Sequence, residues 1–189
     1  MARWESDSRG RLEQAALALY GERGFEQTTV AEIARRAGLT ERTYFRYFAD
    51  KREVLFWGAG ALKEQIVSGV ADAPEAAAPL DVVAAALEGA ANALFQGRRD
   101  HARQRQAVVA AHTGLQEREL IKLATLAAAI ADALRQRGVG EPTATLVAET
   151  GIVVFKVAFE RWIAGDNHRA LAQQIHELFA ELKAVTAGN

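Results

Sequence analysis

The segment TTVAEIARRAGLTERTYFRYFADKR, residues 28–52, constrains the fold of this chain more than any other. It begins with Thr28 and Thr29, whose hydroxyls can accept hydrogen bonds from the free N–H groups at the start of a helix. Apolar side chains then recur at the i, i+3, i+4 and i+7 spacing of one helical face: Val30, Ile33, Ala34 and Ala37. The pattern predicts a short helix with one buried face.

A second short helix is predicted to follow after a tight turn. Gly38 stands where the first helix needs a left-handed residue to end it, Leu39 fills the corner, and Thr40 can cap a helix that extends to about Phe48. Tyr44 and Phe48 are four residues apart and can face the apolar stripe of the first helix. The two helices and their turn form a helix-turn-helix.

The second helix directs charged and aromatic side chains away from this packing. Its outer face carries Glu41, Arg42, Phe45 and Arg46. Duplex DNA explains an exposed phenylalanine between arginines, because Arg can bond to the edge of guanine in the major groove and an apolar ring can contact a thymine methyl group. A third helix is expected to open at Asp50, with Lys51 beside free amides that can hold a phosphate.

Residues 9–55 resemble the DNA-binding domain of the TetR family of bacterial transcriptional regulators. The resemblance rests on the run G-L-T-x-x-T-x-F-x-Y-F-x-D-K from Gly38 to Lys51. It also includes the first helix, in which Ala16, Leu19 and Tyr20 precede Gly24 and Phe25. The resemblance implies an all-α protein of about nine helices, three of them for DNA and the remainder for dimerisation and ligand binding.

The resemblance also implies roles for individual residues. Thr28 and Thr29 match positions that hold the phosphate backbone, and Lys51 matches a lysine that grips it. Positions that touch bases or phosphates correspond to Glu41, Arg42, Thr43, Phe45 and Tyr47. With Arg46 on the outer face, these form the predicted DNA-binding set. Arg42 replaces a small residue and Phe45 replaces a tyrosine in many members, so the operator sequence does not transfer.

The charge of the chain is concentrated in this segment. The formal net charge is −1 and the sequence pI is about 6.4, so the whole chain does not attract nucleic acid strongly. Between Ala34 and Arg52, however, six basic side chains stand against two acidic ones. A basic patch on a nearly neutral protein favours a defined docking face over nonspecific coating.

Other classes of function find little support. The absence of cysteine excludes disulfides and thiolate chemistry and fits a cytoplasmic protein, and residues 1–10 lack the apolar core of a signal peptide. No pair of the four histidines has the i, i+4 spacing of a metal site, and no P-loop, G-x-S-x-G or dinucleotide motif occurs. We therefore expect no enzyme activity, no metal, no cofactor and no membrane span.

The remainder of the chain is expected to form a larger helical domain. We divide the chain into a DNA-binding domain at residues 1–50 and a ligand-binding and dimerisation domain at residues 51–189. Helical patterns cover roughly residues 51–70, 80–97, 99–112, 116–137, 142–164 and 167–186, and Pro74 and Pro79 mark a linker. Gly165 is expected to end the penultimate helix, and Asp166 to cap the last one.

Dimer and ligand sites are predicted on the last helices. The final helix places one apolar stripe on Leu171, Ile175, Leu178, Phe179 and Leu182, which we expect at a two-fold interface. A ligand pocket could be formed by Phe95, His112, Thr150, Phe155, Phe159 and Trp162. Ordinary core packing explains the aromatic and alanine-rich segments equally well, and the sequence does not separate the two.

These features predict a DNA-binding transcriptional regulator, a repressor by its resemblance, that binds a palindromic operator as a homodimer. A small hydrophobic ligand is expected to release it. The alternative is a helical protein-binding or scaffold module in which the arginines only form a solvated surface. The effector, the operator sequence, the regulated genes and the sign of regulation are not encoded in any motif of this chain.

Overall fold

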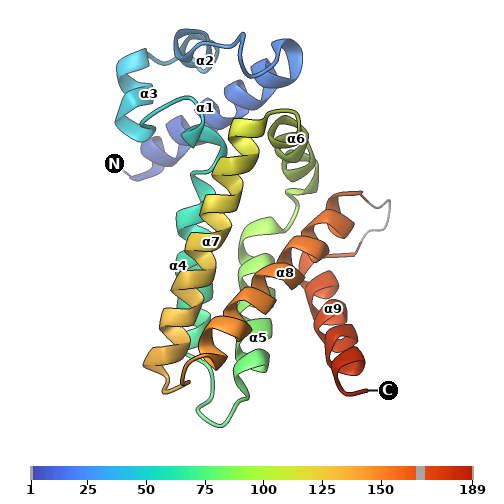
Figure 1. The fold of residues 1–189 in the computed structure, drawn as a ribbon. Helices are drawn as coiled ribbons and strands as arrows, with labels where there is room; N and C mark the ends of the chain where they lie inside the picture. The colour runs from blue at the N-terminus through green and yellow to red at the C-terminus, as the bar shows by residue number, and fades with distance from the viewer. Residues whose placement is uncertain (1, 165–168, 189) are drawn as a thin grey trace. The chain divides into compact units, whose positions relative to one another are not determined.

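The computed structural model describes residues 2–164 and 169–188. Over these ranges the chain is all-helical, as the sequence predicts, with nine α-helices, one 3-10 helix and no strand (Figure 1). The α-helices are α1 (Ala2–Arg23), α2 (Val30–Arg36), α3 (Glu41–Tyr47), α4 (Gly58–Ala71), α5 (Pro79–Phe95), α6 (Arg99–Ala110), α7 (Thr113–Gln136), α8 (Thr143–Ala164) and α9 (Leu171–Thr186). The expected helix end at Gly165 and the cap at Asp166 lie outside the described residues. None of the described helices combines the length and apolar content that a membrane span requires.

The helices form two compact units. The first, here called the head, contains Met1–Gly58 together with Arg103–Glu119, and the second, the body, contains Ala59–Ala102 and Leu120–Asn189. The division expected from sequence falls after residue 50, whereas the head also takes in residues 51–58 and a segment about fifty residues further along the chain. We call residues 103–119 the corner segment. It comprises the later part of α6, the short connection at residues 111–112 and the first part of α7.

The head has its own hydrophobic core. Leu12 of α1, Ile33 of α2 and Tyr44 of α3 are fully buried in it. Two residues of the corner segment, Val109 and Leu115, are equally inaccessible and belong to the same cluster. The three-helix motif is therefore completed by side chains that are distant from it in sequence.

The helix that was predicted to open at Asp50 begins later than expected. Residues 51–57 do not continue into α4, which begins at Gly58, but form a turn and a 3-10 helix at Glu53–Leu55. Asp50 does cap backbone amides, since its Oδ1 accepts from Arg52 N at 2.8 Å and Glu53 N at 3.2 Å, but the capped element is this short turn. The turn buries the consecutive residues Val54, Leu55 and Phe56 in the head core.

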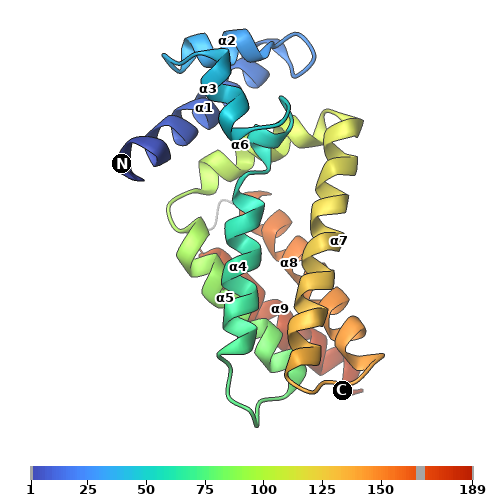
Figure 2. The same ribbon diagram turned by 90° about the vertical axis from the view of Figure 1, so that its left-hand side faces the viewer.

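The body is built around α5, α8 and α9, which pack against one another (Figures 1 and 2). Small residues bring two of these helices close together. A Cβ added to Gly151 of α8 would lie 2.5 Å from Val83 Cγ1 and 3.5 Å from Leu87 Cδ1 of α5. Gly69 of α4 approaches Ala86 similarly, because its added Cβ would lie 3.1 Å from the Ala86 Cβ. The small side chains therefore serve close helix packing, the simpler of the two interpretations of their abundance.

The contact at Gly151 makes a prediction about stability. Alanine favours a helix interior over glycine by about 1 kcal/mol, but overpacking a core costs roughly 1–3 kcal/mol. We expect Gly151→Ala to lower the free energy of unfolding by about 1 kcal/mol, because the short branched side chain of Val83 has little freedom to move. The double variant with Val83→Ala should be less destabilised than the sum of the single ones in urea titrations. Simple additivity would show that this contact does not limit the packing.

The apolar stripe of α9 has a different use from the predicted one. Its members Leu171, Ile175, Leu178 and Phe179 are buried in the core of the single chain, and Leu182 packs partly against that core. These residues were predicted to lie at a subunit interface. In the structure, α5 and α8 pack against α9 within the same chain. An apolar stripe reports that a helix face is covered, not which surface covers it.

Candidate nucleic-acid interface

The helix-turn-helix is held by local side-chain and backbone bonds. Thr29 caps α2 in a capping box with Glu32, whose amide donates to the threonine hydroxyl at 3.2 Å. The hydrogen bonds that Thr29 gives in return lower the pKa of Glu32. Gly38 adopts the left-handed conformation with φ +67, and Leu39 N donates to Ala34 O at 2.8 Å. The turn therefore has the geometry that its sequence predicts.

The second helix of the motif, α3, has one buried face and one exposed face. Thr40 caps it by accepting from Thr43 N at 3.2 Å, and Tyr44 is completely buried behind it. Phe45 is 54% exposed, although it is a large apolar residue. The neighbouring side chains Glu41, Arg42 and Arg46 are also exposed, and Thr43 and Tyr47 are half-buried. Most of the side chains predicted to contact bases are thus accessible on one short helix.

Two residues predicted to contact phosphates have internal partners. The Thr28 side chain is buried, and its hydroxyl donates to Gly24 O at 2.9 Å. The Lys51 ammonium donates to Phe25 O at 3.0 Å and lies 4.2 Å from the centre of the Phe25 ring. Both side chains stabilise the connection between α1 and α2. Their predicted phosphate contacts would require that they exchange or share these partners.

Tyrosine hydroxyls hold the turn after α3 in place. Tyr20 of α1 donates to Lys51 O at 2.7 Å, and Tyr44 of α3 donates to Asp50 O at 3.2 Å. Burial is the main cause that raises the pKa of both phenols above their ordinary value, and the negative charge of Asp50 contributes. The sequence predicts Tyr44 in the core, but no local pattern predicts the partner of either hydroxyl.

These tyrosines predict a loss of stability in alkali. Because folding raises their pKa, their contribution to stability is complete below the unfolded value of about 10 and is lost as the pH rises above it. We expect the urea midpoint to be level from pH 7 to 9 and to fall beyond about pH 10. The variant Tyr20→Phe should lose about 1 kcal/mol at pH 8 and show a weaker fall in alkali. If the urea midpoint of that variant falls as steeply above pH 10, groups other than Tyr20 cause the loss of stability.

The corner segment is bonded to the motif by several polar side chains. Arg105 donates to Leu55 O at 2.7 Å and to Glu119 at 2.8 Å, and Arg118 Nε donates to Glu53 at 2.8 Å. All of these groups belong to the head. No sequence motif predicts the contacts of Arg105 with Leu55 and of Arg118 with Glu53, because they join residues 50 and 65 positions apart.

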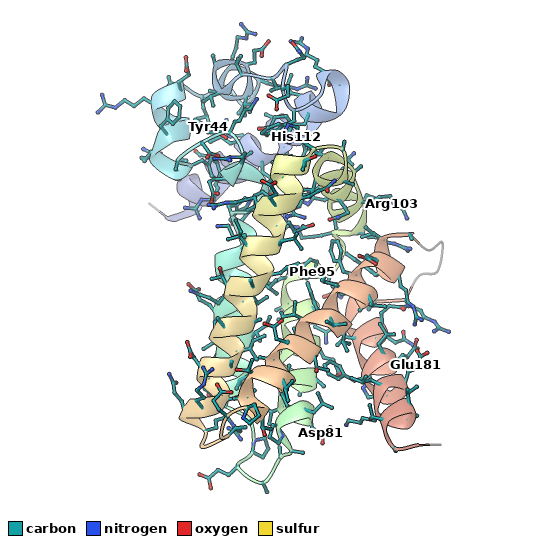
Figure 3. All side chains as sticks on the ribbon, in the orientation of Figure 1. Tyr44, Asp81, Phe95, Arg103, His112 and Glu181 are labelled. Carbon is teal, nitrogen blue, oxygen red and sulfur yellow. The ribbon has the colours of Figure 1, made fainter. Side chains whose placement is uncertain are left out.

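His112 lies in the corner segment, between the ends of α6 and α7 (Figure 3). Its Nε2 is hydrogen-bonded to Glu26, which lowers the pKa of that carboxyl group, and its ring meets the Phe25 ring edge-on at 4.8 Å. His112 was predicted to line a ligand pocket. The structure instead places it against the connection between α1 and α2, at the same place as Lys51.

The aromatic residues predicted for the ligand site do come together in the body. Phe95, at the end of α5 (Figure 3), lies 6.2 Å from Phe155, 6.0 Å from Phe159 and 5.9 Å from Trp162, measured between ring centres. Phe155 and Trp162 are buried, whereas Phe95, Phe159 and Thr150 are half-buried. We call the four rings the aromatic cluster.

A capped helix-turn-helix whose second helix exposes arginine and phenylalanine is the architecture of a DNA-binding domain. Residues 13–56 match the family model described as bacterial regulatory proteins, tetR family. The regulator TcmR of Streptomyces glaucescens, an HTH-type transcriptional regulator, is 34% identical over 93 residues, which are 49% of this chain and 39% of TcmR. The chain therefore carries the N-terminal domain of the TetR family of bacterial transcriptional regulators.

Two further proteins are similar over most of the chain. MftR of Mycobacterium tuberculosis, a transcriptional regulator named for mycofactocin biosynthesis, is 28% identical over 171 residues, covering 88% of this chain and 85% of MftR. FadR of Thermus thermophilus, a TetR-family repressor whose structure contains lauroyl-CoA, has a TM-score of 0.51 and 23% identity, with 93% of each chain covered. The likeness to FadR concerns the fold alone, and the match to TcmR spans well under half of that protein.

Proposed function

We propose that this protein is a transcriptional repressor that binds a palindromic operator as a homodimer and leaves it when a small hydrophobic ligand binds. The observation that carries the proposal is the exposed face of α3, where Arg42, Phe45 and Arg46 stand on a rigid, doubly capped turn. Neither Arg42 nor Arg46 forms an ion pair within the part of the chain whose side chains are described, so both are available to an anionic partner. In a major groove the first turn of such a helix contacts base edges.

Salt dependence tests whether this face binds DNA. A protein that neutralises phosphates releases counterions, so the logarithm of its affinity should fall linearly with the logarithm of the salt concentration. We expect such a line in fluorescence anisotropy with a duplex that the protein has selected from a random pool. Binding that is flat in salt would favour the alternative, a module that docks another protein through the same helix.

Dimerisation requires an exposed apolar surface, and α8 offers one. Leu146, Val153 and Val157 are 63%, 59% and 37% exposed and follow one another at spacings of seven and four residues, which places them on one face. Because the stripe of α9 is buried within the chain, we propose this face of α8 as the dimer interface instead. A second copy of the same face would cover it about a two-fold axis.

A charge placed on this face should separate the subunits. We expect Val153→Glu to shift the protein from dimer to monomer in sedimentation velocity, because the two-fold axis brings the carboxylates of both copies into an apolar contact. Ala128→Glu on the exposed side of α7 serves as the matched control and should remain dimeric. A dimer that survives Val153→Glu but dissociates in the control would place the interface on α7.

The ligand is proposed to bind in the body near the aromatic cluster. The cluster supplies large apolar side chains, two of which remain partly accessible. FadR, which shares the fold, was solved with an acyl-CoA, and this supports an acyl or aromatic ligand of similar hydrophobic character. Ligand binding can act on the head because α4, α6 and α7 each continue from one unit into the other along the chain.

Such a ligand must prefer the form of the dimer that does not fit the operator. Only a difference in affinity between two forms shifts the equilibrium between them. Long-chain acyl-CoA should therefore release the bound duplex in the anisotropy assay, and Phe159→Ala should weaken this release while leaving affinity for DNA unchanged. Equal release of both proteins would place the ligand away from the aromatic cluster.

A further inference from the structure

Arg9, in the first half of α1, lies beside the end of the recognition helix α3. Its guanidinium carbon is 5.2 Å from the centre of the Tyr47 ring and 5.6 Å from the centre of the Trp57 ring. The side chain is exposed, and no carboxylate within the described part of the chain is paired with it. Two aromatic rings thus hold a solvent-facing cation in one place, since a guanidinium over an aromatic ring is attracted to its face.

Arg46 brings a second cation to the same tyrosine. Its Nη2 donates to Tyr47 Oη at 2.6 Å, and its guanidinium carbon lies 4.7 Å from the centre of the Tyr47 ring. The guanidinium groups of Arg9 and Arg46 therefore both lie against the Tyr47 ring. Because Tyr47 Oη accepts from Arg46, its own proton is free to be donated outward. Like charges this close repel one another, and an anion bound between them would offset that repulsion.

We propose that Arg9, with Arg46 and the Tyr47 hydroxyl, binds one phosphate of the operator backbone. This inference rests on the proposed DNA-binding function and adds a contact from outside the helix-turn-helix motif. The chemistry favours a phosphate because guanidinium groups and a phenol are all donors, and Arg matches phosphate oxygens with paired N–H groups. Arg9 fixes the register of α3 on the duplex and carries no base preference of its own.

The contact is tested by the salt slope of Arg9→Ala on a selected operator. Because each half-site loses one phosphate contact, the variant dimer should bind at least about tenfold more weakly, its slope of log affinity against log salt should fall by about 2, and the ranking of base-substituted operators should stay unchanged. Arg9→Lys should restore most of the slope, because it keeps the charge. Arg135→Ala is the matched control: that arginine is paired with Asp132 and Glu141 in the body, and its loss should leave the slope as in the natural protein.

Single methylphosphonate substitutions along the operator then identify the phosphate. In the natural protein, neutralisation should weaken binding at several phosphates of each half-site, and at one of these positions the loss should disappear in Arg9→Ala. Equal slopes and equal methylphosphonate profiles for the two proteins would overturn the Arg9 contact while leaving operator binding intact. A natural protein that binds no duplex with a salt-dependent affinity would instead overturn the proposed function itself. Thermal melts of each variant show whether a lost slope comes from a lost fold.

Discussion

The double variant Arg42→Ala, Arg46→Ala is expected to lose most of its affinity for the operator without losing its fold. Both side chains are exposed on α3. A base-edge contact, proposed for Arg42, contributes about 1–3 kcal/mol, and the phosphate contact proposed for Arg46 contributes on the order of 1 kcal/mol. If the two contributions add, affinity at moderate salt should fall by at least about 30-fold. The urea midpoint should change little, because exposed substitutions away from caps and cores are usually within about 0.5 kcal/mol.

The control for this loss removes the same charge from other exposed arginines. Arg135 and Arg169 are each paired with carboxylates in the body, at 2.5 Å to Asp132 and 2.8 Å to Glu177. The double variant Arg135→Ala, Arg169→Ala should therefore bind the operator nearly as well as the natural protein. If both double variants lose affinity equally, net charge governs binding, and α3 has no special role.

The second large effect is expected from the corner segment. Leu115 is completely buried in the head core and belongs to residues 103–119 rather than to the three-helix motif. Truncating a buried leucine to alanine costs about 2–5 kcal/mol, a large part of the stability of a small unit. Leu115→Ala should unfold the head at a lower urea concentration and weaken operator binding in proportion to the unfolded fraction.

Leu120→Ala provides a close comparison, since Leu120 lies five residues further along α7 and is 58% exposed. Its unfolding free energy should stay within about 0.5 kcal/mol of the natural value. A fragment of residues 1–58 should lack stable helical structure in circular dichroism, because it loses Val109, Leu115 and the ion pair between Arg118 and Glu53. A folded fragment with operator affinity would show that the corner segment is dispensable.

The sequence predicted the helix-turn-helix well because its determinants are local. Gly38 in the left-handed conformation, Thr40 as a cap and Tyr44 as a buried anchor each follow from chemistry within a few residues. Asp50 was identified as a cap for the same reason. The wrong part of that prediction was the capped element, since the burial of Leu55 and Phe56 against other helices, which no local pattern encodes, bends the chain into a 3-10 turn.

Long-range partners account for the other differences. His112 was predicted near a ligand, but its partner Glu26 lies 86 residues away and was not identified from spacing. The stripe through Ile175 was predicted at a subunit interface, although α5 and α8 cover it within the chain. No sequence pattern predicts a role for Arg9, because only the fold brings it beside Tyr47. A periodic pattern identifies a buried face, whereas the identity of what lies against it depends on the tertiary structure.

Selection of duplexes from a random pool, performed with the natural protein and with Arg42→Ala, tests most directly whether α3 reads DNA sequence. The natural protein should enrich an inverted repeat whose half-sites are centred one helical turn apart, about 34–36 Å, or a multiple of it. Arg42→Ala should enrich the same repeat with preference lost at one base position of each half-site. No enriched repeat, or identical preferences at every position for the two proteins, would contradict the role assigned to α3.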